Sequence, residues 1–136
     1  MIVQTPPTID PMHLLQEGAA TLGLELSPTS IEQFHFYLTQ LKLWNQRVNL
    51  TGLKTDRDLV VKHFLDSLAV LPFLGEPHSL ADLGSGPGFP GLALKIVRPE
   101  LQLTLVEARE KKAAFLEYIV SCLKLNDVTV ARTHLT

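Results

Sequence analysis

The stretch ADLGSGPGFPG, residues 81–91, contains the residue types that most clearly point to chemistry. Asp82 precedes Gly84, Gly86 and Gly88, and Glu107 follows a later apolar run. Because glycine has no Cβ, these positions let a ligand approach the main chain closely. A carboxylate such as Glu107 can accept hydrogen bonds from both hydroxyls of a ribose. The pattern predicts a binding site for a nucleoside-containing cofactor.

Three classes of cofactor compete for such a loop. A P-loop nucleotide site requires Gly-Lys followed by Ser or Thr, but residues 91–93 read GLA, which excludes phosphoryl transfer. A dinucleotide site uses backbone N–H groups to hold pyrophosphate, and Pro87 and Pro90 each remove one donor. S-adenosyl-L-methionine carries no phosphate, so the loss of these donors matters little. The loop favours S-adenosyl-L-methionine, and NAD stays an alternative because it would use Glu107 in the same way.

Strand and helix patterns alternate from residue 79 onward, which indicates the elements that position this loop. Residues 79–83, 101–108 and 128–132 are typical of strands, and residues 91–97 and 110–125 are typical of helices. Connections of this length predict parallel strands. Ligands of open parallel sheets bind beyond the carboxyl ends of the strands, where the glycine loop would lie. We therefore expect an α/β, Rossmann-like fold.

The region before residue 79 is expected to be helical. Apolar residues recur every three or four positions over residues 29–48, and Thr29 with Glu32 predicts a capping box. A second helix is expected over residues 56–74, closed by Pro72. The predicted organisation is a tail and the start of the helical region in residues 1–28, helices in 29–78, and a partial cofactor-binding domain in 79–136.

Composition excludes several classes of function. The chain has 12 Lys and Arg against 14 Asp and Glu, so any contact with RNA must be local. It has no apolar run long enough to span a membrane, no secretory signal and a single cysteine, which together predict a cytoplasmic protein. The five histidines lack ligand spacing, so no metal site is expected.

Two further features are expected to have structural roles. His63, Asp66 and Ser67 share one helical turn and imitate a hydrolytic set, but neighbours on one helix seldom reach triad geometry. We expect them to serve packing or the helix surface. Cys122 has no nearby acid or base in sequence and is expected to be a buried or half-buried helix residue.

Four stretches of the chain share one resemblance: NLTGL at 49–53, HFLDSL at 63–68, LADLGSGPGFPGLALKIVRPE at 80–100 and LTLVEAREKKAAFLE at 103–117. Together they resemble the glucose-inhibited division protein B family. Its members are bacterial methyltransferases that use S-adenosyl-L-methionine and modify N7 of a guanine in small-subunit (16S) ribosomal RNA. The resemblance implies a class I methyltransferase fold, of which this chain supplies N-terminal helices and the first half of a seven-stranded sheet.

The resemblance also implies roles for particular residues. Gly84 and Phe89 would contact the cofactor, with Phe89 covering its adenine or methionine arm, and Glu107 would lie near its ribose. A further contact falls on Thr133 and His134, where the sequence departs from the small residue and Glu of the family. Guanine N7 carries no proton to remove, so we expect no catalytic acid or base.

Small-subunit ribosomal RNA, naked or in an assembled particle, is the expected partner. Its phosphates are expected to contact Arg109, Lys111 and Lys112, with Lys62 and Arg57 as second choices. Family members continue for several more strands, so we expect a C-terminally truncated chain. A noncatalytic cofactor- or RNA-binding module, or an NAD-binding oxidoreductase fragment, remain as alternatives.

Overall fold

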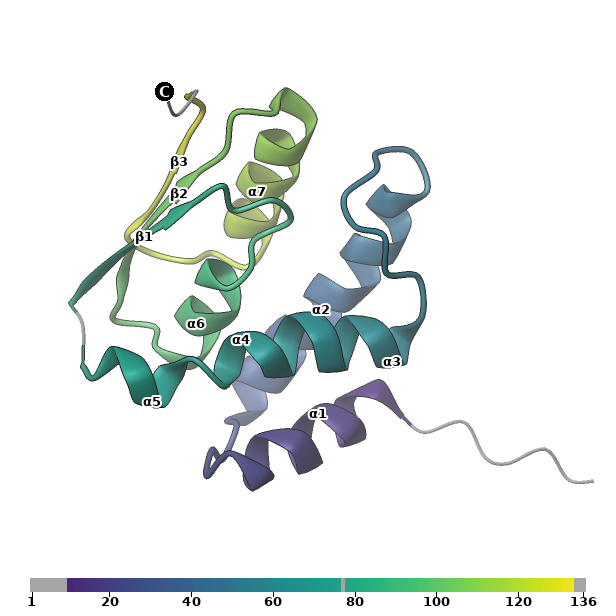
Figure 1. Cartoon of the computed structure of the whole chain (residues 1–136), viewed down its shortest axis with the longest axis vertical. Coiled ribbons are helices and arrows are strands. Elements are labelled where there is room, and N and C mark those ends of the chain that lie inside the picture. The colour runs from purple at the N-terminus through teal and green to yellow at the C-terminus, as the bar shows by residue number, and fades with distance from the viewer. Residues whose placement is uncertain (1–9, 77, 134–136) are drawn as a thin grey trace, which may run out of the picture.

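A layer of helices packs beside a small sheet in the structure, a computed structural model that describes residues 10–76 and 78–133 (Figure 1). The helical layer comprises α1 (Pro11–Thr21), α2 (Pro28–Asn45), α3 (Asp56–Asp58), the π-helix η1 (Leu59–Leu65), α4 (Asp66–Leu68) and α5 (Leu71–Leu74). The second part comprises β1 (Ser79–Leu83), α6 (Gly91–Val97), β2 (Gln102–Val106), α7 (Glu110–Cys122) and β3 (Val128–Ala131).

The sheet is parallel and has the strand order β1-β2-β3. Asp82 lies opposite Leu105, and Leu105 lies opposite Val130. The predicted β-α-β-α-β order and the Rossmann-like fold class are therefore confirmed. Because the strands are parallel, the residues that follow β1 and β2 meet at the same edge of the sheet.

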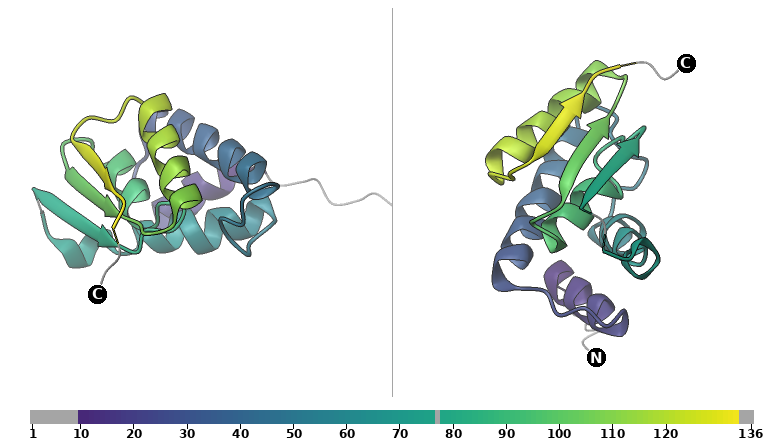
Figure 2. Two further views of the ribbon diagram at one scale, coloured as in Figure 1. Left: turned by 90° about the horizontal axis from the view of Figure 1, so that it is seen from above. Right: turned by 90° about the vertical axis from the view of Figure 1, so that its left-hand side faces the viewer.

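Helices α6 and α7 cover one face of the sheet (Figure 2). Leu103 and Leu105 of β2 point toward these helices and are buried. The side chain of Leu83, on the edge strand β1, is 64% exposed. Helices α2 and α4 in turn contact α6, so the helical layer packs on the outer side of the helices that cover the sheet.

One hydrophobic core joins the helical layer to the sheet. Each buried aromatic side chain removes a large apolar area from water, so these residues dominate the packing energy. Rings from α2, η1 and α7 meet in it, with Phe34 and Phe64 at a centroid distance of 5.0 Å. The buried members around the site are Phe34, Tyr37, Phe64, Leu92, Phe115 and Leu116. The N-terminal helices and the strands are thus held in one fixed arrangement.

Two expectations about the helix boundaries were wrong. Helix α2 is capped by Ser27, whose Oγ accepts a hydrogen bond from Ser30 N at 3.0 Å, and not by Thr29. Pro28 occupies the first helical position, where its fixed φ favours an earlier start. Pro72 does not end the preceding helix but lies in the first turn of α5, where its missing N–H costs no hydrogen bond.

Two other features were not foreseen. Residues 11–21 form α1, which Asp10 caps by accepting a hydrogen bond from Met12 N at 3.0 Å. Cys122 is exposed, contrary to the expectation of a buried or half-buried residue, because it lies on the outer face of α7. Within residues 10–76 and 78–133, no helix is both long enough and apolar enough to cross a membrane.

Candidate cofactor-binding site

The glycine loop begins where β1 ends, at the carboxyl edge of the sheet. Gly84, Gly86 and Gly88 have φ angles of +74°, +55° and +109°. Residues with side chains rarely adopt these angles, so the backbone path itself requires glycine at all three positions. The loop then leads into α6 at Gly91.

The three glycines differ in what surrounds them. A Cβ added at Gly84 or Gly86 would meet no described atom within 4 Å. At Gly88 the added Cβ would lie 2.3 Å from Tyr37 Oη and 2.8 Å from Leu92 Cδ1. Gly84 and Gly86 therefore face open space, whereas Gly88 is surrounded by the protein's own side chains.

The N–H groups of the loop all donate within the protein. Gly84 N and Ser85 N donate to Val106 O at 2.8 and 3.1 Å. Gly88 N and Phe89 N donate to Ser85 O at 2.9 and 3.2 Å. Gly86 N and Gly91 N donate to carboxylates of the site, and the two prolines have no N–H. The loop therefore offers shape and open space to a ligand, but no unused backbone donor.

Glu107 directly follows β2 and fixes the loop from the neighbouring strand. Its Oε1 accepts a hydrogen bond from Gly86 N at 3.0 Å, and its Oε2 accepts one from Arg109 N at 2.8 Å. The side chain is only 6% exposed. Each oxygen keeps a further lone pair, so Glu107 can still accept a ligand hydroxyl.

Asp82 lies inside β1 and holds the start of α6. Its Oδ2 accepts a hydrogen bond from Gly91 N at 2.9 Å, and a Cβ at Gly91 would lie 2.8 Å from the same oxygen. Burial raises the pKa of Asp82, while the hydrogen bond from Gly91 lowers it. Asp82 thus positions the loop at its far end, and its predicted contact with a cofactor stays a prediction.

Phe89 lies in a stack of aromatic rings. Its ring is nearly parallel to Tyr37, with a centroid distance of 5.2 Å, and to His63, with a centroid distance of 4.4 Å. His63 Nε2 lies 2.8 Å from Thr51 Oγ1, and the Tyr37 hydroxyl donates to Pro87 O at 2.5 Å. Burial lowers the pKa of His63, and the charge of Asp66 partly opposes this. The helical layer therefore holds the loop through ring stacking and one hydrogen bond.

A family model described as rRNA small subunit methyltransferase G matches residues 30–135. The chain belongs to this family. Three of its curated relatives, all named Ribosomal RNA small subunit methyltransferase G, match most of the chain. The protein of Roseiflexus castenholzii is 54% identical over 120 residues, which are 88% of this chain and 51% of the relative. That of Roseiflexus sp. is 51% identical over 120 residues, with the same coverage.

The third relative, from Acetivibrio thermocellus, is 40% identical over 117 residues, which are 85% of this chain and 48% of the relative. The chain thus spans about half the length of the curated relatives that it matches. The matched family is the glucose-inhibited division protein B family that the sequence resembled, so the resemblance is confirmed at the level of the family.

Three of the stretches that resemble the methyltransferase G family meet at the aromatic stack. Thr51 comes from NLTGL, His63 from HFLDSL and Phe89 from GPGFPG. Sequence reasoning missed the roles of Thr51, His63 and Tyr37, because these residues are far apart in the chain. The one sequence signal that these stretches meet in space was that all three belong to the same family resemblance.

His63, Asp66 and Ser67 do not form a hydrolytic set. Ser67 Oγ donates to the main-chain oxygen of His63 at 2.6 Å, and Asp66 is exposed. The imidazole ring of His63 faces Thr51 and Phe89 instead. The expected role in packing or at the helix surface is confirmed, with His63 and Ser67 packed and Asp66 on the surface.

The remaining predicted site residues lie at the carboxyl edge or beyond the described part of the chain. Arg109 and Lys111 are exposed at the start of α7, and Lys112 is half-buried there. Thr133 follows β3 and is exposed, and His134 lies outside the described residues. Their predicted RNA and cofactor contacts stay predictions. Within residues 10–76 and 78–133, no cluster of three His, Cys, Asp or Glu side chains has a metal-binding arrangement.

Proposed function

We propose that this chain forms the cofactor-binding part of an S-adenosyl-L-methionine-dependent methyltransferase that acts on N7 of a guanine in small-subunit ribosomal RNA. Membership of the methyltransferase G family supports methyl transfer. The names of the relatives support ribosomal RNA as the substrate. The choice of guanine N7 rests on the family resemblance alone.

The observation that supports the choice of cofactor is the hydrogen bonding of the backbone N–H groups in the glycine loop. All the N–H groups of residues 84–91 donate within the protein. A pyrophosphate would need such donors, so NAD fits this loop poorly. S-adenosyl-L-methionine needs open space beside the main chain, which Gly84 and Gly86 provide. Glu107 lies next to that space with lone pairs for a ribose diol.

When bound, S-adenosyl-L-methionine supplies a methyl group that a ring nitrogen with a free lone pair accepts without a base. The residues of this chain would then act by binding and orientation. Glu107 would hold the ribose, and the contacts of Asp82 and Tyr37 would keep the loop rigid. Orientation alone contributes up to about 7–11 kcal/mol in favourable model reactions. Such a site needs no acid or base dyad.

Calorimetry tests the choice of cofactor. We expect the chain to bind S-adenosyl-L-methionine and not NAD, and Gly84→Ala to weaken binding at least tenfold, because the new Cβ occupies ligand space. Gly23→Ala is the matched control, since Gly23 has a φ of +80° and open surroundings in the connection between α1 and α2. Binding of NAD, or equal affinity in all three proteins, would refute the assignment.

A chimera tests the reaction. The 120 matched residues of the Roseiflexus castenholzii protein are replaced by those of this chain, and the purified chimera is given labelled S-adenosyl-L-methionine with small-subunit ribosomal RNA or with the assembled subunit. We expect N7-methylguanine in the nucleoside digest, and its loss with Gly84→Ala but not with Gly23→Ala. A folded, cofactor-binding chimera that methylates another atom, or nothing, would contradict the proposal.

A further inference from the structure

The basic residues of the helical layer are concentrated in one segment. All Lys and Arg residues of the first 80 positions lie within residues 42–62, although the whole chain has a net charge of −2. We call this the 42–62 basic segment. Its basic residues are all exposed: Lys42, Arg47, Lys54, Arg57 and Lys62.

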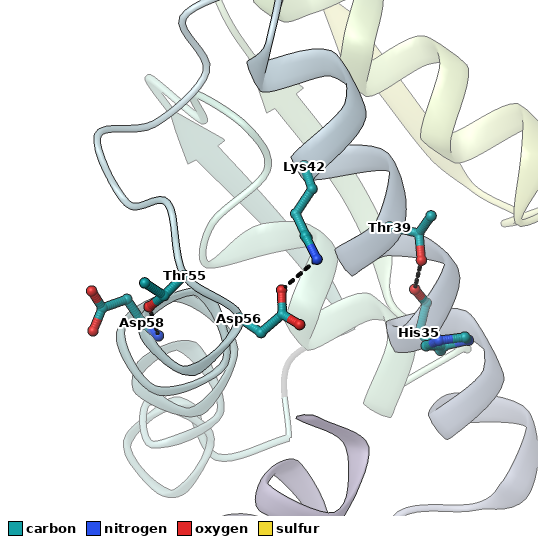
Figure 3. A network of polar contacts seen from close by, with 6 residues as sticks. All are labelled: His35, Thr39, Lys42, Thr55, Asp56 and Asp58. Carbon is teal, nitrogen blue, oxygen red and sulfur yellow. Dashed lines mark hydrogen bonds and ion pairs between the residues drawn. The ribbon is translucent and has the colours of Figure 1, made fainter. Parts of the chain in front are cut away.

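The acidic residues of the segment neutralise only part of this charge. Lys42 Nζ lies 2.8 Å from Asp56 Oδ1, as Figure 3 shows, and Lys62 Nζ lies 3.9 Å from Asp58 Oδ1. Within residues 10–76 and 78–133, the remaining cations, Arg47, Lys54 and Arg57, have no ion-pair partner. The segment therefore presents three uncompensated positive charges.

The segment is held in shape without a ligand. Asn45 Oδ1 accepts hydrogen bonds from Leu50 N at 2.9 Å and from Thr51 N at 3.1 Å, which closes the loop after α2. The Lys42–Asp56 ion pair joins α2 to α3 (Figure 3). A hollow of about 240 Å³ lies between these elements, lined in part by Asn45 and Lys54. Preformed positions reduce the ordering cost of binding.

The segment lies beside the candidate cofactor site. Its loop, residues 46–55, lies at the same end of the molecule as the start of α7 (Figures 1 and 2). The contact of Thr51 with His63, and the stacking of His63 on Phe89, connect it to the glycine loop. A phosphate chain bound along this segment would therefore pass close to the glycine loop.

We infer that the 42–62 basic segment binds phosphates of the RNA substrate, with Arg47, Lys54 and Arg57 as the principal contacts. The inference rests on the proposed function. It adds a second surface to the predicted one at Arg109, Lys111 and Lys112, and this surface includes Arg57, which was only a second choice from the sequence. Phosphate contacts position a nucleic acid and carry no direct sequence information. The segment would thus set the orientation of the RNA, while other groups select the base.

The salt dependence of RNA binding tests this. A transcript of small-subunit ribosomal RNA is titrated with the chain between 25 and 200 mM salt, with Arg47→Gln/Lys54→Gln as the variant. Arg98→Gln/Lys124→Gln is the matched control, because it also removes one exposed Arg and one exposed Lys, at the amino ends of β2 and β3. Each lost phosphate contact lowers the slope of log K against log salt by about 0.7–0.9.

We expect the slope to fall by about 1.4–1.8 in the variant and to stay unchanged in the control. Calorimetry with S-adenosyl-L-methionine should give equal affinities for both, because neither change touches the glycine loop. Equal slopes in variant and control would overturn the inference and leave the proposed function standing. No RNA binding by the unmodified chain would also overturn the inference, while methyl transfer by the chimera would still decide the proposed function. Competition by polyglutamate as strong as that by RNA would assign the surface to an acidic protein instead.

Discussion

Replacement of Gly88 by alanine should destabilise the fold far more than the same replacement at Gly84. Both positions have a positive φ, of +109° and +74°, so each variant bears a backbone cost of about 1–2 kcal/mol. Only at Gly88 does the new Cβ also meet Tyr37 Oη, at 2.3 Å, and Leu92 Cδ1, at 2.8 Å. Overpacking of this kind costs about 1–3 kcal/mol.

The expected loss in the free energy of unfolding is therefore roughly 2–5 kcal/mol for Gly88→Ala and about 1–2 kcal/mol for Gly84→Ala. Urea unfolding followed by circular dichroism measures both values, and an unchanged m-value shows that the unfolded states are comparable. Gly84→Ala should instead act mainly on binding: its affinity for S-adenosyl-L-methionine should fall while the fold stays nearly intact.

A double variant checks the steric reasoning directly. Tyr37→Phe alone removes the hydrogen bond to Pro87 O and should cost about 1 kcal/mol. In the Gly88→Ala background the same change also removes the atom nearest to the new Cβ. The double variant should therefore lose less stability than the sum of the losses of the two single variants. Additive losses, or equal losses for Gly88→Ala and Gly84→Ala, would refute the account of the loop.

Three further predictions follow from single side chains. Lys95, 1% exposed, donates to Pro99 O and Leu101 O, so Lys95→Met should lower the free energy of unfolding by roughly 2–4 kcal/mol in urea titrations; no loss would contradict this role. Glu107→Gln should cost about 1–3 kcal/mol in the same assay, because one amide oxygen cannot replace two carboxylate oxygens that each accept an N–H; it should also weaken binding of S-adenosyl-L-methionine. Burial lowers the folded pKa of His63 below its ordinary 6.5, so its contribution is present above pH 6.5 and is lost as the pH falls through the folded pKa. The difference in unfolding free energy between the wild type and His63→Gln should shrink from pH 7.5 to 5.5, and a constant difference would show that His63 does not titrate in this range.

Much of the strand and helix order could be predicted because it depends on short-range patterns. The apolar run ending at Val106, and the helical spacing of Leu116 and Ile119, report burial on one face of β2 and α7. Helix boundaries were predicted less well. Ser27 and Thr29 are both able to cap a helix, and the choice follows from Pro28, whose fixed φ suits the first helical position.

Helix α1 was missed although its start carries a local signal. Asp10 followed by Pro11 is a typical capping residue and first helical residue, but after Leu15 the apolar stripe continues only with small residues. Its buried residues, Met12, Leu15 and Ala19, face inward, and α1 packs against η1. The exposure of Cys122 likewise depends on which side of α7 faces the core.

The sequence by itself determined where the chain must turn with glycine, the parallel order of the strands and the carboxylate beyond the second strand. These properties depend on φ preferences and on periodicity over a few residues. Only the tertiary structure decided that Gly84 and Gly86 face open space while Gly88 is enclosed by Tyr37, because that difference depends on where α2 lies relative to the loop. The meeting of His63 with Phe89 has the same origin, since it joins residues whose distance is set by packing of the helical layer on the sheet.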